Sequence, residues 1–363
     1  KEQVIAVIGP LASAAAAPVA ERAEELRVPL LVLSQRTGLP QLGRYVFRNF
    51  LTPRAQVDAM VDYAISYQGY RSFAVFYPAT ERGGAMAERF WQRIEEEGGQ
   101  VVAVQSYDPD ETDFRKPLRR LYGKQFVDKG IGAGDLELPY LTDREKPQLP
   151  GGSATMLVPG EDFQAVFVPD GFKRVSMIAP AMVYENFNLA DTYQSRMPVT
   201  LLGSAGLNHD DFVRRGERYV RGALFVDAFF VRGGEPETIG FVHRFEERYE
   251  RKPGLLETFG YETTRDLLTL LGQGVKTRPS LRRELARFEP EASLTGSLGY
   301  DEAGEMRRDL LLLSVAEDSI VQIYPPPLPP EMAPLDPIPM EGGGSAPPDE
   351  PAEEAPQEPE VTP

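Results

Sequence analysis

The chain has 363 residues, of which 42% are hydrophobic, with no cysteine, two histidines and a formal net charge of −16 at pH 7. This composition excludes a disulfide framework, a thiol nucleophile and a cysteine-ligated metal, and it argues against nucleic acid or an anionic membrane as a partner. No apolar run reaches about 18 residues, so no membrane-spanning segment is predicted. The length suits roughly two or three domains.

The first forty residues predict one β-α-β unit. Val4–Ile8 is a short apolar strand that Gly9-Pro10 ends, and Ser13 stands where the N-cap of a helix over Ala14–Arg27 is expected. Val28–Leu33 is a second strand, followed by the polar loop Ser34–Gly38. A crossover this short makes the strands parallel, so both loops lie at the carboxyl ends of strands, where open α/β sheets bind ligands.

Strands and helices continue to alternate along the chain, which is typical of the α/β class. Strands are predicted at Tyr45–Arg48, Ser72–Tyr77, Val101–Ser106, Phe163–Val168, Val199–Gly203, Gly222–Phe230, Gly296–Tyr300 and Leu310–Ala316. Helices are predicted at Pro53–Gln68, Ala85–Glu97, Asp113–Tyr122, Arg174–Tyr184, Pro236–Tyr249, Thr258–Gly272 and Arg278–Phe288.

Two segments depart from this alternation. Residues 123–161 mix glycine, proline and charge, and they are interpreted as an insertion with partial order. Residues 324–363 form a predicted disordered tail, in which the stretch from Pro325 holds 14 prolines, nine acidic residues and no Lys or Arg. A spacer tail is the main interpretation, and a proline-rich partner motif is the alternative.

No catalytic constellation is found. Ser204 lacks the glycine two positions earlier that a nucleophile elbow requires, and Ser13 is better explained as a helix cap. The sequence His209-Asp210-Asp211 is weighed as a metal or acid-base site against a capped helix start, and the latter is favoured. The chain is therefore not expected to be an enzyme, and no metal or cofactor is predicted.

Polar loops at strand ends form the remaining candidate site. They contain small hydroxyl groups, backbone N–H groups and the guanidinium of Arg36, and they are Ser13, Ser34–Thr37, Pro78–Gly84, Asp170-Gly171 and Ser204–Asn208. This set of groups fits recognition of a small polar ligand and capping of the loops equally well.

The motifs in order resemble a known family. They are V-I-A-V-I-G-P-L-x-S (Val4–Ser13), V-P-L-L-V-L-S (Val28–Ser34), Y-V-F-R-N-F (Tyr45–Phe50), F-x-x-x-x-E-E-x-G-G-x-V-V (Phe90–Val102), Y-D-P-D-x-T-D-F (Tyr107–Phe114), F-Q-A-V-F-V-P-D (Phe163–Asp170), G-A-L-F-V-D-A-F-F (Gly222–Phe230) and G-S-L-G-Y-D-E-A-G (Gly296–Gly304). Over about Val4–Val321 the chain resembles the type I periplasmic binding proteins of the leucine/isoleucine/valine-binding group. It is most similar to the branch of penicillin-binding-protein activators, which are envelope lipoproteins.

The resemblance implies two Rossmann-like lobes of parallel sheet and flanking helices, which close on a ligand by a hinge. The first lobe would hold residues 1–68 and 233–292, and the second would hold residues 69–232 and 293–323. The family opens with a further strand-helix-strand before the Val4 strand, so the first lobe is expected to lack this initial unit.

The resemblance also implies a ligand cleft between the lobes. Ser13 matches the serine that holds the ligand carboxylate, and Ser34 and Thr37 lie in the loop that supplies further carboxylate contacts, where Arg36 departs from the family. Gly83 replaces the family's tyrosine, and either Asp170 or Gly171 stands at a usually aromatic position. Ala205 falls near the place where an acidic residue pairs with the ligand ammonium. Recognition of the carboxylate is thus expected to survive in part, and recognition of the ammonium to be lost.

Two functions follow from the resemblance. The first is a non-catalytic regulator in the periplasm or cell envelope that contacts a penicillin-binding protein and so controls peptidoglycan synthesis, with a lipid anchor upstream of Lys1. The alternative is a solute-binding receptor that works with an ABC permease and binds an amino acid or another small polar or anionic ligand.

Overall fold

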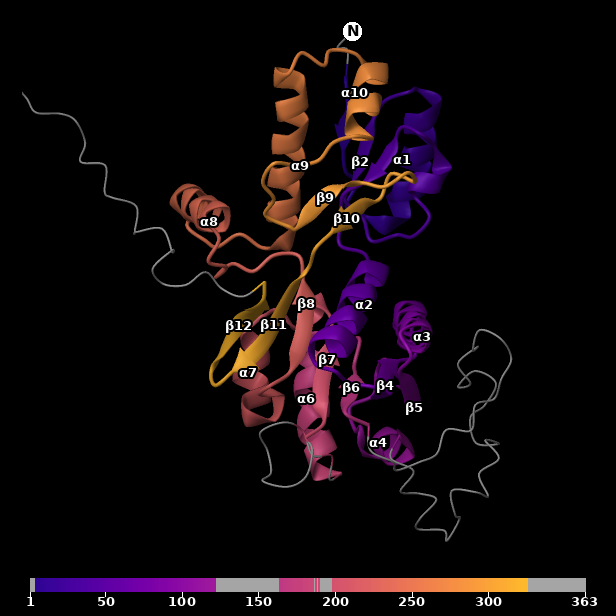
Figure 1. Ribbon diagram of the computed structural model, residues 1–363, viewed down its shortest axis with the longest axis vertical. Coiled ribbons are helices and arrows are strands. Elements are labelled where there is room, and N and C mark those ends of the chain that lie inside the picture. Colours follow the sequence, from indigo (N-terminus) through magenta and orange to yellow (C-terminus); the bar gives the residue numbers. More distant parts are fainter. Residues whose placement is uncertain (1–3, 122–162, 186, 188, 190–197, 326–363) are drawn as a thin grey trace, which may run out of the picture.

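The computed structural model describes residues 4–121, 163–185, 187, 189 and 198–325. The predicted insertion at 123–161 and the tail beyond Pro325 lie outside these residues. Within the described part, helices and strands form two lobes, one above the other in Figure 1, that are joined at a waist.

A three-stranded parallel sheet forms the centre of the first lobe, in the order β1 (Val7–Ile8), β2 (Leu30–Val32), β3 (Val46–Arg48). Helix α1 (Ser13–Glu25) packs on one face through Ala16, Ala20 and Ala23. The other face is covered by α9 (Leu255–Gly272) and α10 (Arg278–Leu285). The short turn η1 (Pro40–Leu42) precedes β3, and α8 (Pro236–Tyr249) lies beside this lobe.

The second lobe contains a seven-stranded sheet in the order β12-β11-β8-β7-β6-β4-β5. Five strands are parallel, and β11 and β12 form an antiparallel edge. The strands are β4 (Ser72–Pro78), β5 (Gln100–Tyr107), β6 (Ala165–Phe167), β7 (Thr200–Gly203), β8 (Leu224–Asp227), β11 (Leu311–Ala316) and β12 (Ser319–Tyr324).

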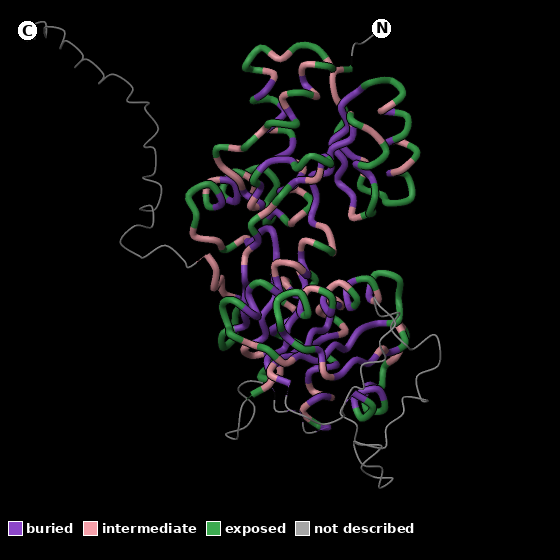
Figure 2. Tube along the Cα trace, turned by 45° about the vertical axis from the view of Figure 1, so that its right-hand side comes forward, coloured by how far each residue is buried: buried purple, intermediate pink, exposed green. Residues whose placement is uncertain are grey.

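Helices cover both faces of this sheet. Along β4, Phe73 and Val75 face α2 (Pro53–Asp62) and α3 (Glu81–Glu96), whereas Ala74 and Phe76 belong to the cluster on the opposite face. That face is covered by α4 (Arg115–Leu121), α6 (Phe172–Tyr184), α7 (Asp210–Gly216) and the turn η5 (Glu217–Val220). A strand that is buried on both faces reads as a continuous apolar run, which is why SFAVFY predicted its strand correctly. Figure 2 shows the buried chain at the centre of each lobe.

The predicted α/β fold is confirmed, and two details of the lobe boundaries are wrong. Helix α2 continues as the π-helical turn η2 (Tyr63–Tyr67) and packs against α3 of the second lobe, although residues 1–68 were expected in the first lobe. The hairpin of β9 (Ser297–Tyr300) and β10 (Met306–Arg308) contributes Tyr300 and Met306 to the core of the first lobe, although residues 293–323 were expected in the second.

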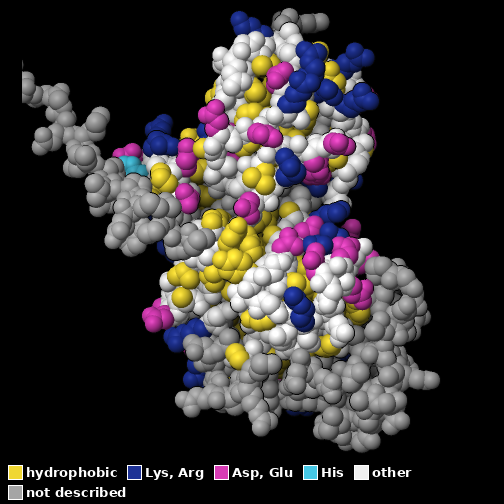
Figure 3. Space-filling view, in the orientation of Figure 1, with side chains coloured by type: hydrophobic (Ala, Val, Ile, Leu, Met, Phe, Trp, Pro, Cys, Tyr) yellow, Lys and Arg dark blue, Asp and Glu magenta, His cyan; other side chains and the backbone are white. Residues whose placement is uncertain are grey.

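Charged side chains also join α2 to α3. Arg89 Nε forms an ion pair with Asp58 Oδ1 at 2.6 Å, and Arg93 Nη2 forms one with Asp62 Oδ1 at 2.8 Å. Figure 3 shows these opposite charges gathered over the two helices, just below the waist. The pairs hold α2 to the second lobe in addition to the apolar contacts of Val57, Met60 and Val61.

Stability of the second lobe should depend on the stack of Phe90 on Phe167, whose ring centroids lie 4.3 Å apart at an interplanar angle of 10°. We expect Phe90→Ala to lower the free energy of unfolding by about 3–5 kcal/mol, because it removes a fully buried ring and leaves a cavity. Urea denaturation followed by tryptophan fluorescence measures the change. Leu268→Ala is the control, since Leu268 is 60% exposed, and a loss of similar size there would contradict the explanation.

Candidate functional site

The carboxyl ends of the parallel strands in both lobes face the waist. The chain leaves the carboxyl end of β3 through residues 49–52 and enters α2 of the second lobe, and it leaves the carboxyl end of β8 through residues 228–235 and enters α8 beside the first lobe. Both crossings start at carboxyl ends, so these ends of the two sheets point toward each other (Figure 1). This is the edge at which open α/β sheets bind ligands.

Three of the predicted residues in the first lobe lie together. The Oγ atoms of Ser13 and Ser34 are 3.2 Å apart, the backbone N–H of Arg36 donates to Ser34 Oγ at 3.3 Å, and Arg36 Nη1 donates to the Ser13 carbonyl at 3.3 Å. Thr37 is exposed in the turn that follows. We call Ser13, Ser34 and Arg36 the serine–arginine cluster.

Ser13 reaches this cluster because it is not the helix cap that the sequence suggested. The N-cap of α1 is Ala12, which makes no side-chain bond, and Ser13 is the first helical residue. Its hydroxyl is therefore directed to Ser34 instead of the backbone of its own helix. Hydroxyl donors, a guanidinium and the N-terminus of a helix are together suited to bind an acidic group.

The loop of the cluster is held in place by Arg48, which the sequence analysis did not single out. Arg48 Nη1 donates to the Arg36 carbonyl, while Nε and Nη2 each bind one oxygen of Glu305 at 2.6 Å. The Arg48 side chain is only 7% exposed. Burial raises the pKa of Glu305, and the positive charge of Arg48 opposes this shift.

Gly83 does not lie in a strand-end loop as expected. It is in the first turn of α3, where its N–H donates to the capping hydroxyl of Thr80 at 3.0 Å. An added Cβ would lie 2.2 Å from the Pro78 carbonyl oxygen, so the position has no space for a side chain. The neighbouring residue, Arg82, is exposed near Asp170. The sequence analysis did not name it as a candidate binding residue. Among the residues that the structure describes, none forms a hydrogen bond or ion pair with its guanidinium.

Asp170 and Ala205 lie on neighbouring loops of the second lobe, because Gly206 of the second loop approaches Asp170-Gly171 closely. The Asp170 carboxylate accepts bonds from the Tyr107 hydroxyl at 2.8 Å and the Gly171 N–H at 2.7 Å, and it pairs with Arg174 at 3.1 Å. Ala205 opens the turn η4 (Ala205–Leu207) and donates its N–H to Gln56 Oε1 at 3.1 Å. The negative charge of Asp170 is therefore already compensated.

His209 is a helix cap, as the favoured interpretation held. Its Nδ1 accepts a hydrogen bond from the N–H of Asp211 at 3.1 Å, and its ring stacks on Phe172 with centroids 4.0 Å apart.

The described residues contain no group of three or more His, Asp or Glu side chains placed to hold a metal ion. None of the helices in this part of the chain has the length and apolar character that a membrane crossing requires.

Asp227 lies at the carboxyl end of β8, where the chain crosses the waist. Its oxygens accept bonds from Asn208 Nδ2 at 2.9 Å and from the N–H of Ala228 at 2.7 Å. Burial raises the pKa of this carboxyl to about 7, although the hydrogen bonds oppose the shift. Asp227 therefore gains a proton more readily in the folded chain than in the unfolded chain.

Residues 1–125 match the family model described as periplasmic binding protein. The chain is similar in structure to a branched-chain amino acid ABC transporter protein from Rhodospirillum rubrum, with 22% identity, a TM-score of 0.70 and coverage of 88% of this chain and 80% of that one. It is also similar to the isoleucine-bound branched-chain amino acid binding protein of Streptococcus pneumoniae, with 17% identity, a TM-score of 0.58 and coverage of 87% and 79%.

A third similar structure is a solute-binding protein of an ABC transporter from Rhodopseudomonas palustris in complex with 3,4-dihydroxybenzoic acid, with 16% identity, a TM-score of 0.56 and coverage of 86% and 74%. No curated protein matches the chain in sequence. These likenesses show the two-lobed type I periplasmic-binding-protein fold that the sequence predicted. None of these three proteins is described as a penicillin-binding-protein activator, so the expected placement in that branch has no support here.

The raised pKa of Asp227 predicts how stability depends on pH. The folded chain holds its proton up to about pH 7, while the unfolded chain releases it near pH 4. The free energy of unfolding should thus fall between about pH 4 and 7 and then level off, relative to Asp227→Asn. Chemical denaturation of both chains at several pH values measures this difference, and a constant offset across the range would refute it.

Proposed function

We propose that the protein is a non-catalytic solute-binding receptor of the periplasm, which works with an ABC transporter and binds a small ligand through an acidic group. The single observation that carries the proposal is the serine–arginine cluster at the carboxyl edge of the first sheet. Two hydroxyl groups, one guanidinium and the start of α1 converge there. Charge-assisted hydrogen bonds to such a cluster would hold a carboxylate.

The comparisons support the same chemistry. The ligands of two similar structures are isoleucine and 3,4-dihydroxybenzoic acid. Both are carboxylic acids, and only isoleucine also carries an ammonium group. A carboxylate is therefore the group that these ligands share.

The carboxylates that follow β6 and end β8 in the second lobe, Asp170 and Asp227, already have partners. Asp170 is bonded to Tyr107, Gly171 and Arg174, and Asp227 is buried beside Asn208. Ala205 carries no charge. Burying an ammonium group without a partner is costly, so an acid without an amino group is favoured over a branched-chain amino acid.

The role of Arg36 can be tested by calorimetry with a panel of amino acids, aliphatic dicarboxylates and hydroxybenzoates. We expect at least one carboxylate to bind, and Arg36→Gln to weaken it about 10- to 100-fold, because a hydrogen bond to a charged group contributes about 1.5–3 kcal/mol. Arg22→Gln is the matched control, since Arg22 is an exposed residue of α1 that pairs with Glu25. Equal losses in both variants would contradict the assignment.

Regulation of a penicillin-binding protein remains the second candidate. The observation that favours it is that Ala205 carries no charge and Asp170 is already paired, which a protein without an amino acid ligand would tolerate. If no compound in the panel releases heat or shifts the melting temperature, the receptor proposal fails. A pull-down with a bifunctional penicillin-binding protein then tests this candidate.

A further inference from the structure

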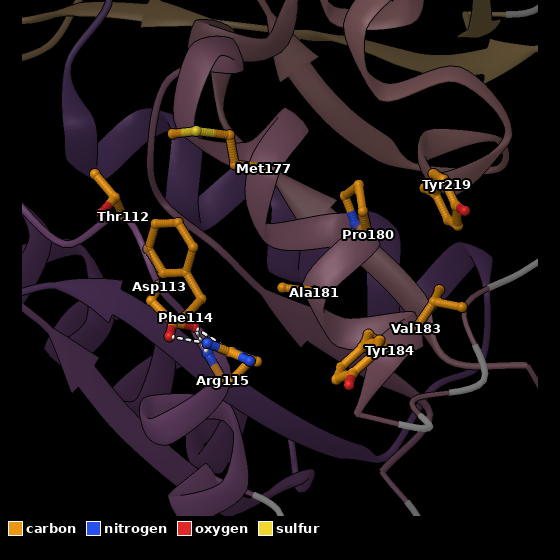
Figure 4. Close-up of a pocket in the computed structure, with 10 residues that line it drawn as sticks. All are labelled: Thr112, Asp113, Phe114, Arg115, Met177, Pro180, Ala181, Val183, Tyr184 and Tyr219. Carbon is orange, nitrogen blue, oxygen red and sulfur yellow. Dashed lines mark hydrogen bonds and ion pairs between the residues drawn. The ribbon is translucent and has the colours of Figure 1, made fainter.

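An open groove lies on the second lobe, on the face of the sheet that α4, α6 and η5 cover. Its volume is about 760 Å³, and its wall contains Phe114, Arg115, Met177, Pro180, Tyr184 and Tyr219. Figure 4 shows Tyr184, Tyr219 and Pro180 on one side of Ala181, and Phe114 and Arg115 on the other. None of the residues of the candidate ligand site lines this groove.

Exposed aromatic and apolar side chains lie in the groove beside polar ones. Tyr184 is 70% exposed and Met177 is 46% exposed, although both belong to an amphipathic helix whose other face is buried. Tyrosine rings beside a proline and an aliphatic thioether form the kind of surface on which polyproline II segments dock. Such segments lose little conformational entropy on binding because they are already extended.

Helix α4 borders the groove and is rich in positive charge, although Arg115 is its only residue in the groove wall, where Asp113 lies beside it. This helix has the sequence RKPLRRL, with Arg115, Lys116, Arg119 and Arg120 and no acidic residue. Arg115 pairs with Asp113, which precedes the helix, at 2.5 Å, and Arg119 pairs with Glu185 at 2.9 Å. Four cationic side chains against these two carboxylates still leave an excess of positive charge at α4. An occupant that is rich in proline and carries negative charge would match both the rings and this helix.

The chain itself contains such a segment. Beyond Pro325 the sequence continues for 38 residues with 13 prolines, nine acidic residues and no Lys or Arg. It follows β12, which belongs to the sheet that carries the groove. At about 3.1 Å per residue an extended segment of this length reaches about 120 Å, whereas seven strands span about 30 Å.

We propose that residues 326–363 bind back into the groove between α4, α6 and η5, with prolines against Tyr184 and Tyr219 and acidic residues beside α4. Attachment to the same lobe gives the tail an effective concentration on the order of millimolar, which favours it over a separate proline-rich protein of modest affinity. The tail is then a ligand of its own lobe and not only a spacer.

Chemical modification of tyrosine tests the proposal on the full chain and on a chain that ends at Pro325. N-acetylimidazole acetylates exposed tyrosines, and peptide mass spectrometry gives the rate at each one. We expect Tyr184 to react about fivefold more slowly in the full chain. Tyr249, which is 59% exposed on α8, is the internal control and should react equally in both chains.

A charge variant separates docking from simple crowding by the tail. Lys116→Glu in the full chain should raise the Tyr184 rate toward that of the shortened chain, and so should about 1 M salt, which screens the charges. Lys276→Glu is the matched control, because Lys276 is exposed on the first lobe. Equal Tyr184 rates in the full and shortened chains would overturn the proposal, and so would protection that grows with protein concentration, which would indicate a second copy in the groove.

Discussion

The ion pair between Arg48 and Glu305 fixes the position of the serine–arginine cluster in the first lobe. It joins residues 257 positions apart, and the same guanidinium binds the carbonyl of Arg36. The position of the serine–arginine cluster therefore depends on a turn that the chain forms near its end. Since the Arg48 side chain is 7% exposed, removing Glu305 would leave a buried charge without a partner, which typically costs 3–5 kcal/mol.

Much of this fold was predictable because local patterns agree with the final packing. The strands of the second lobe are buried on both faces, so apolar runs such as SFAVFY identify them, and α8 begins and ends at the residues that the pattern predicted. Strands β10 and β12 were missed. The short β10 has no apolar pattern and exists through its pairing with β9, whereas the run SIVQIY of β12 is rich in β-branched residues and was a visible strand signal. The helix α2 was predicted, but its place in the second lobe was not, because tertiary contacts with α3 decide to which lobe it belongs.

The site was predictable only as far as the topology determines it. The rule that ligands bind at the carboxyl ends of parallel strands singled out Ser13, Ser34 and Arg36, which do lie within hydrogen-bond distance of one another, while their role in binding stays a prediction. It did not show that Ser13 is helical or that α3 starts at Glu81, before Gly83. Thr80 followed by Glu81 is a typical N-terminal signal for a helix, and it predicts the start of α3 at Glu81. Arg82 would then lie in the first turn of α3, next to the end of β4. The contact of Arg48 with Glu305 had no local signal.

The crossings at the waist mean that neither lobe is a continuous piece of the chain. The first lobe takes β1 to β3 from the beginning of the sequence, α9 and α10 from its later third, and the β9–β10 hairpin from about residue 300. During synthesis, which starts at the N-terminus, the chain therefore cannot complete the first lobe until nearly all described residues have left the ribosome. Domains that form from contiguous segments fold during synthesis, whereas here the second lobe can gather most of its strands while the first still lacks its closing hairpin.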